Sequence, residues 1–291
     1  MPQDRPDPQR SLSSFDSRRR VGWRPHLEPS LFDLHRPALV GMVHLKALPG
    51  SPGWQGSMEA VRNAARADVE ALVAGGCDAL LVENMGDLPW LKGEVDPATV
   101  AAMALCVADV VEAGLPTGVQ ILAGANEQAL GVALAAGAHF LRAEAFAYGH
   151  VADEGWIEAC AGPLLRSRRA LGAESVQIWA DVQKKHAAHA ATADMSLADL
   201  AHGTAFCGAD ALIVTGASTG HPTDPAHLAA VRTAGVPVAI GSGITPDTAP
   251  GLAEADAWIV GTWLKEEGDW RRPVDPARVQ ALAELARTAR R

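Results

Sequence analysis

The chain has 291 residues, of which 48% are hydrophobic and 20% are charged, a composition typical of a folded globular protein rather than a disordered one. Its length fits one α/β barrel of about 250 residues with short tails. The formal net charge of −9 argues against a nucleic-acid partner, because a phosphate backbone requires a concentrated basic surface.

Residues 1–30 are rich in Pro, Arg, Ser and Asp without periodicity, which predicts a disordered, flexible N-terminal extension and leaves residues 31–291 as the single domain. No apolar run approaches the roughly 18 to 20 residues that cross a bilayer, and the N-terminus lacks the apolar core of a secretory signal. The cysteines are widely spaced, which indicates buried small residues in a reducing compartment: Cys77, Cys106, Cys160 and Cys207. We therefore expect a cytoplasmic protein.

One short sequence motif recurs along the chain: small residues with glycine, then Asp or His, then an apolar run. It occurs at residues 74–82, 136–141 and 207–214, with a more divergent copy at 255–260. Glycine just past a helix supplies a left-handed cap, and a short apolar run without alternation is typical of a strand buried on both faces. Each copy therefore predicts a junction from a helix into a parallel strand.

The apolar runs predict eight strands, each followed by a helix, at residues 38–44, 78–83, 117–122, 139–144, 175–181, 210–215, 237–241 and 257–261. Caps predict the helix starts at Asp96-Pro97, Asn126, Asp153, Ser196, Asp224-Pro225, Thr245-Pro246 and Asp275-Pro276. Eight such units predict a single (β/α)8 TIM barrel. The alternative is a doubly wound open sheet, but the first strand lacks the Gly-x-Gly-x-x-Gly turn of a dinucleotide site.

Active sites of such barrels lie at the carboxyl ends of the strands. Polar residues end the first six runs: His44 and Lys46, Glu83 and Asn84, Gln120, Arg142 and Glu144, Asp181 with Lys184, Lys185 and His186, and Thr215. Glu83, Glu144 and Asp181 are candidates for proton transfer, because burial raises the pKa of a carboxyl toward neutrality. Two alternatives stay open: Glu83 as an ion-pair partner of Arg142 or Lys184, or the three carboxylates with His44 around a divalent cation.

The adjacent pair Lys184 and Lys185 offers a candidate lysine for a Schiff base or for stabilising an enolate, and exposed loop lysines are the alternative. No spacing motif for a metal or a cofactor is present, so a divalent cation stays only an option.

The last two runs end in glycine-rich turns, which predict a phosphate cradle from Gly241, Ser242, Gly243, Gly261 and Thr262. Backbone N–H groups there can reach an anion, and a following helix would point its positive end at it. Gly216, after the sixth run, would add a further wall. Tight turning alone is the alternative explanation.

Several strings together resemble the BtpA/SgcQ family, named for photosystem I biogenesis, over residues of about 35 to 285. They lie at residues 41–52, 82–84, 150–155, 180–186, 214–216 and 241–245. The resemblance implies a phosphate-binding TIM-type barrel; one cyanobacterial member is implicated in photosystem I accumulation, and most members have no established reaction. Many members carry Arg-Asn-Asp after strand three and Asn at the end of strand four, where this chain has Ala123-Gly124-Ala125 and Glu144.

Two functions follow as expectations. The first is an enzyme of isomerase or lyase type that acts on a phosphorylated small molecule. The alternative is a noncatalytic assembly or stability factor of the photosystem I biogenesis type, with a ligand-sensing accessory protein as a third option. A homo-oligomer is expected from the fold class alone.

Overall fold

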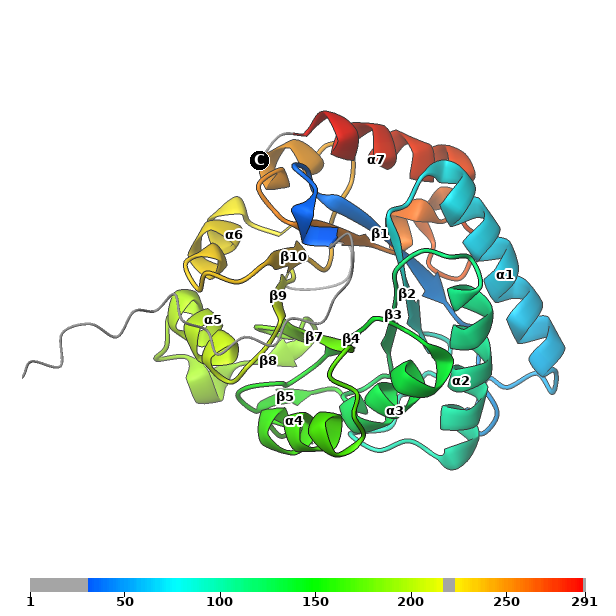
Figure 1. Cartoon of the computed structure of the whole chain (residues 1–291), viewed down its shortest axis with the longest axis horizontal. Helices are drawn as coiled ribbons and strands as arrows, with labels where there is room; N and C mark the ends of the chain where they lie inside the picture. Colours follow the sequence, from blue (N-terminus) through cyan, green and yellow to red (C-terminus); the bar gives the residue numbers. More distant parts are fainter. Residues whose placement is uncertain (1–30, 217–222, 290–291) are drawn as a thin grey trace, which may run out of the picture.

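The computed structural model describes residues 31–216 and 223–289, so the predicted extension at residues 1–30 lies outside the described part of the chain, as do residues 217–222 and 290–291. Eight parallel strands close into a barrel in the order β1-β11-β10-β9-β7-β4-β3-β2, with the helices ringed around it (Figure 1). The (β/α)8 barrel is therefore confirmed.

The barrel strands are β1 (Ala38–His44), β2 (Ala79–Glu83), β3 (Thr117–Gln120), β4 (Phe140–Ala143), β7 (Gln177–Asp181), β9 (Ala211–Val214), β10 (Val238–Ile240) and β11 (Ala257–Val260). Each lies within a predicted run. The surrounding helices are α1 (Met58–Gly75), α2 (Pro97–Val111), α3 (Asn126–Ala136), α4 (Ala161–Ala170), α5 (Leu197–Phe206), α6 (Pro225–Arg232) and α7 (Pro276–Thr288).

The seventh barrel strand breaks the predicted pattern. After β10 the chain forms only a turn at Thr245 and the 3-10 helix η3 (Ala249–Leu252), so no α-helix starts at Thr245-Pro246. Two further predicted caps are wrong. The amide of Asn126 donates to the carbonyl of Glu144 instead of capping α3, and Asp153 lies in a hairpin turn. Cys207 is exposed, contrary to expectation.

Alternate strand residues divide the core into two parts. One set packs against the helices, and the other fills the barrel interior: Ala38, Val40, Met42, Ala79, Leu81, Phe140, Trp179, Ala211, Ile213, Ala239, Ala257 and Ile259. Phe140 and Trp179 stack with their ring centroids 4.1 Å apart. Gly118 lets the Phe140 ring reach the β3 backbone, since a Cβ there would lie 2.2 Å from Phe140 Cε2.

At the amino end of the barrel, the Asp or His of the repeated sequence motif accepts a hydrogen bond from the backbone of the neighbouring strand. The carboxylates of Asp78, Asp210 and Asp256 accept the backbone N–H groups of Leu39, Ile178 and Val238 at 2.8, 2.9 and 2.7 Å. Nδ1 of His139 accepts the N–H of Thr117 at 3.1 Å. These side chains satisfy strand amides that have no ladder partner, so the repeat is structural rather than catalytic.

Both ends of the barrel carry extra structure. At the amino end, the 3-10 helix η1 (Leu31–Asp33) places Leu31 in the interior cluster and the Phe32 ring 5.0 Å from that of Trp179. At the carboxyl end, β5 (His150–Ala152) pairs with β6 (Gly155–Ile157) and with β8 (Ala187–Ala188). This three-stranded sheet joins the loops that follow β4 and β7. No helix in the described part of the chain is long and apolar enough to span a bilayer.

Candidate active site

A cavity of about 240 Å³ opens at the carboxyl end of the barrel. Its lining combines polar side chains from three strand ends and one loop with both predicted glycine turns: His44, Glu83, Arg142, Lys185, Gly241, Ser242, Gly243, Thr245, Gly261 and Thr262, with Met42, Met85, Ile244 and Trp263 among the apolar residues. A concave site with a few convergent polar groups is typical of a small-molecule pocket.

Three polar groups of this cavity have no ion-pair partner in the described part of the chain: His44, Glu83 and Lys185. Burial raises the pKa of Glu83, although Lys185 and Arg142 oppose that rise. Burial, reinforced by Lys265 and Lys185, lowers the pKa of His44 to about 3, so its ring is neutral at physiological pH. Nδ1 of His44 is buried without a hydrogen-bond partner among the described residues.

The two glycine turns follow β10 and β11 and line the cavity beside β1. A Cβ at Gly261 would lie 2.7 Å from Cε1 of His44, and one at Gly241 would lie 3.2 Å from an Arg142 guanidinium nitrogen. Gly243 has a φ of +73°, which glycine adopts without strain. A Cβ at Gly241 would also lie 2.6 Å from Cγ2 of Ile213, so glycine at these positions permits close packing of the turns against neighbouring side chains. Both turns line the cavity.

Two details of the predicted phosphate cradle differ from expectation. The N–H of Gly216 donates to Ser242 Oγ at 2.8 Å, so it supports the cradle rather than facing the cavity. The segments after the two turns are the short 3-10 helices η3 and η4 (Thr262–Leu264), so no long helix points its positive end at the site. An anion would therefore be bound by local N–H groups and nearby cations.

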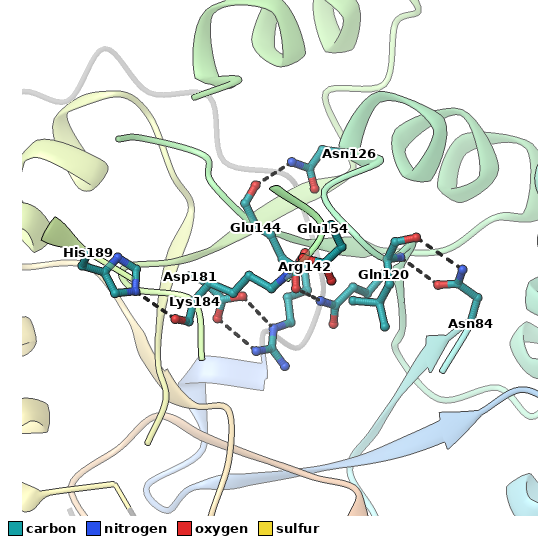
Figure 2. Close-up of polar contacts among 10 residues, drawn as sticks. Asn84, Gln120, Asn126, Arg142, Glu144, Glu154, Asp181, Lys184 and His189 are labelled. Carbon is teal, nitrogen blue, oxygen red and sulfur yellow. Dashed lines mark hydrogen bonds and ion pairs between the residues drawn. The ribbon is translucent and has the colours of Figure 1, made fainter. Parts of the chain in front are cut away.

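Arg142 and Asp181 form a bidentate ion pair beneath the cavity (Figure 2). Nε and Nη2 of Arg142 donate to Asp181 at 3.2 and 3.0 Å, and the two side chains are 4% and 1% exposed. This pair fixes the guanidinium next to Gly241 and occupies both oxygens of Asp181. Asp181 is thereby a positioning residue for Arg142.

Lys184 does not line the cavity and belongs instead to a second polar cluster with Glu144 and Glu154 (Figure 2). Its Nζ lies 3.0 Å from Glu154 Oε2 and 3.5 Å from Glu144 Oε2, and Gln120 donates to Glu144 at 3.3 Å. Burial opposes the charge of Lys184, but the two carboxylates outweigh it and raise its pKa. Because Glu154 lies in the β5–β6 turn, this cluster fastens the outer sheet to the barrel.

The raised pKa of Glu144 predicts that the stability of the fold depends on pH. Burial, only partly offset by Lys184, raises its pKa from 4.5 to about 7. A carboxyl with a raised folded-state pKa stabilises the fold fully below its unfolded pKa and loses that contribution as pH rises through the folded value. At about 1.4 kcal/mol per pKa unit, wild type should lose about 3 kcal/mol more than Glu144→Gln between pH 4.5 and 7. Urea denaturation across this window measures the difference, and a pH-independent difference would contradict the assignment.

The carboxylate triad proposed for a divalent cation is not assembled. Asp181 is bound by Arg142 and Glu144 faces Lys184, so only Glu83 keeps an unpaired carboxyl toward the cavity. Across residues 31–216 and 223–289, no group of three or more His, Cys, Asp or Glu side chains is arranged to hold a metal ion. Neither Arg142 nor Lys184 is an ion-pair partner of Glu83.

Sequence reasoning undervalued three residues of this region. Arg142 could have been found, because Phe140, Arg142 and Glu144 follow the two-residue alternation that points into the barrel. Lys185 could not be distinguished from Lys184, since both lie in the loop beyond β7. Glu154 belongs to the string at residues 150–155 that resembles the family, but it lies in a hairpin turn where a helix was expected.

A larger, open groove of about 1010 Å³ lies at the other end of the barrel, where helices α4 and α5 lead into β7 and β9. Its polar groups are already paired, with Arg168 bound to Asp210 and Arg169 to Glu174. The smaller cavity at the carboxyl end is the better candidate, because sites of such barrels lie there.

Three relatives share most of their length with this chain. An uncharacterised mitochondrial protein of Caenorhabditis elegans is 40% identical over 268 residues, which cover 90% of this chain and 97% of the relative. An uncharacterised protein of Thermococcus kodakarensis is 39% identical over 262 residues, covering 89% and 98%. The photosystem I biogenesis protein BtpA of Synechocystis is 38% identical over 262 residues, covering 87% and 88%.

Solved structures share the fold at low identity. Phosphoribosyl anthranilate isomerase from Thermus thermophilus has a TM-score of 0.52 at 13% identity, covering 87% of this chain and 99% of that one. Orotidine 5'-monophosphate decarboxylase from Methanocaldococcus jannaschii has a TM-score of 0.51 at 14% identity, covering 86% and 98%. These likenesses show the barrel fold alone. Residues 35–288 match the BtpA family, and together with the relatives this match shows that the chain belongs to it.

Proposed function

We propose that this protein is an enzyme that binds a phosphorylated small molecule at the carboxyl end of the barrel and transfers a proton on it, as an isomerase or a lyase. One observation carries the proposal. A single cavity joins an unpaired, buried carboxyl, Glu83, to the two glycine turns of the last barrel strands. A barrel phosphate site holds one end of a substrate, and a carboxyl of raised pKa suits proton transfer at the other.

The residues of the cavity divide by role in this proposal. The N–H of Gly241 donates to the carbonyl of Val214 at 2.8 Å, so the phosphate is bound by the N–H groups of Ser242, Gly243 and the turn at Gly261–Thr262, with the Arg142 guanidinium beside them. Glu83 exchanges the proton, and neutral His44 accepts or donates a hydrogen bond. Ion pairs position the side chains next to the cavity: Asp181 binds Arg142, and Lys184 binds Glu144.

The names of two structural neighbours support the same class of chemistry. The phosphoribosyl anthranilate isomerase and the orotidine 5'-monophosphate decarboxylase are named for phosphorylated substrates, and the reactions in their names are an isomerisation and a decarboxylation. The two reactions differ although the fold is shared. The neighbours therefore support a phosphorylated substrate but do not indicate which one.

Gly243 offers a matched test of the phosphate site. Asn and Asp have nearly the same shape, and both tolerate a positive φ better than other side chains, but only Asp adds a negative charge. We expect Gly243→Asp to abolish binding of inorganic phosphate in isothermal titration calorimetry, and Gly243→Asn to weaken it less. Equal affinities for wild type and Gly243→Asp would place the phosphate elsewhere and contradict the site.

The compartment and the oligomeric state of the enzyme can be proposed as well. All four cysteines are free, which suits the reducing cytoplasm, although the worm relative is named as mitochondrial. We also propose a homo-oligomer in solution, a state that light scattering on the purified full chain measures directly.

A further inference from the structure

Lys185 differs from every other lysine of the chain. The sequence has five lysines: Lys46, Lys92, Lys184, Lys185 and Lys265. Lys46 and Lys92 are exposed on the surface. Lys184 and Lys265 are buried and ion-paired to carboxylates. Lys185 lines the cavity, yet it forms no ion pair with any carboxylate in the described part of the chain.

The environment of Lys185 favours a reactive amine. Burial lowers the pKa of Lys185 and the Arg142 guanidinium lowers it further, and together they outweigh the opposing effect of the carboxylates of Glu83, Asp181 and Glu144. A lysine that is desolvated beside another cation loses its proton more readily, and the neutral amine is the nucleophile. Arg142 keeps its own charge because Asp181 is bound to it, so it remains a fixed cation next to the amine.

We propose that Lys185 forms an imine with the carbonyl carbon of a phosphorylated aldehyde or ketone held in this cavity. This inference rests on the proposed function, because the glycine turns must first hold the phosphate. The lysine ammonium and the carbonyl compound give a protonated imine and one water: a C–N bond replaces the carbonyl C–O bond, the carbonyl oxygen leaves as water with two protons from the ammonium, and nothing is oxidised or reduced.

The position of Glu83 fits the step that follows. A protonated imine withdraws electrons from the neighbouring carbon, so it eases removal of a proton from that carbon or cleavage of its C–C bond. Glu83 ends β2, which β4 and β3 separate from β7 in the barrel. Both groups line the same cavity without an ion pair between them, so a substrate bound in the cavity can contact both.

Reductive trapping tests the imine. The full-length protein is incubated with dihydroxyacetone phosphate and sodium borohydride, which reduces an imine to a stable secondary amine, and the adduct is located by peptide mass mapping. With only five lysines the mapping is unambiguous. We expect one adduct, at Lys185, and much weaker labelling by unphosphorylated dihydroxyacetone, which the glycine turns cannot hold.

Three variants separate the possible results. Lys185→Arg keeps the positive charge but cannot form an imine, so it should bind inorganic phosphate like wild type and give no adduct. Lys46→Met removes an exposed lysine and should leave the adduct at Lys185 unchanged. Gly243→Asp should abolish the adduct together with phosphate binding.

The outcomes distinguish the two proposals. Wild type that binds phosphate but gives no adduct, or one spread over Lys46 and Lys92, overturns the imine and leaves the proposed function standing. Wild type that binds no phosphate overturns the proposed function itself. An adduct on Lys184 would transfer the role to the neighbouring residue and refute the assignment of Lys185.

Discussion

Replacing Glu83 with Gln is expected to lower the turnover of the phosphorylated substrate by about 10²- to 10⁴-fold, the usual contribution of a general acid or base. The Gln side chain keeps the size of Glu83 but cannot exchange a proton. Because the proposed phosphate contacts follow β10 and β11 whereas Glu83 ends β2, KM should change little. Consumption of compounds in a phosphometabolite library, followed by mass spectrometry, identifies the substrate and measures the loss.

The matched control is Glu70→Gln, which makes the same change on the exposed surface of α1 and should leave turnover unaffected. Glu83→Gln should not unfold the protein, because it replaces a carboxyl whose charged form is disfavoured by burial. If a substrate is found and Glu83→Gln turns it over at the wild-type rate, the role of Glu83 is wrong. If wild type consumes nothing in the library, the noncatalytic assembly factor becomes the better explanation.

Asp68→Ala is expected to cost about 3–5 kcal/mol of unfolding free energy, the largest effect on stability among these predictions. Asp68 on α1 binds Nζ of Lys265, which is 1% exposed, and its other oxygen accepts the N–H of Val274 at 2.8 Å. Alanine would leave a buried ammonium and a buried N–H without partners. Urea denaturation at neutral pH measures the loss.

The double variant Asp68→Ala/Lys265→Met shows whether the unpaired charge is the cause. Methionine has a similar length to lysine and no charge, so the double variant should recover most of the lost stability. A double variant as unstable as Asp68→Ala would instead assign the loss to the Val274 N–H or to packing. Because Lys265 also lowers the pKa of His44, the double variant should raise that pKa, which NMR titration of the ring reports.

Much of the barrel could be predicted from local sequence. Strands buried on both faces must be apolar at successive positions, so their runs are visible without any partner, and all eight barrel strands lie within the predicted ranges. The repeated Asp or His marked the strand starts for a reason that sequence could not give, which is the unpaired N–H of the adjacent strand. The predicted caps at Asn126 and Asp153 are wrong because tertiary structure overrode the local preference. Asn126 donates to the distant carbonyl of Glu144, and Asp153 lies in the β5–β6 hairpin.

The sequence by itself determined which segments form the barrel and which of its turns are rich in glycine. Only the tertiary structure decided which charged side chains have no ion-pair partner among the described residues. Asp181 and Glu144 were equivalent to Glu83 as strand-end carboxylates, but Arg142 and Lys184 neutralise them. Lys184 and Lys185 are adjacent in the chain, yet one is bound by Glu154 and the other faces the cavity. Reactivity depends on burial and on the nearest opposite charge, and both are set by residues far away in the sequence.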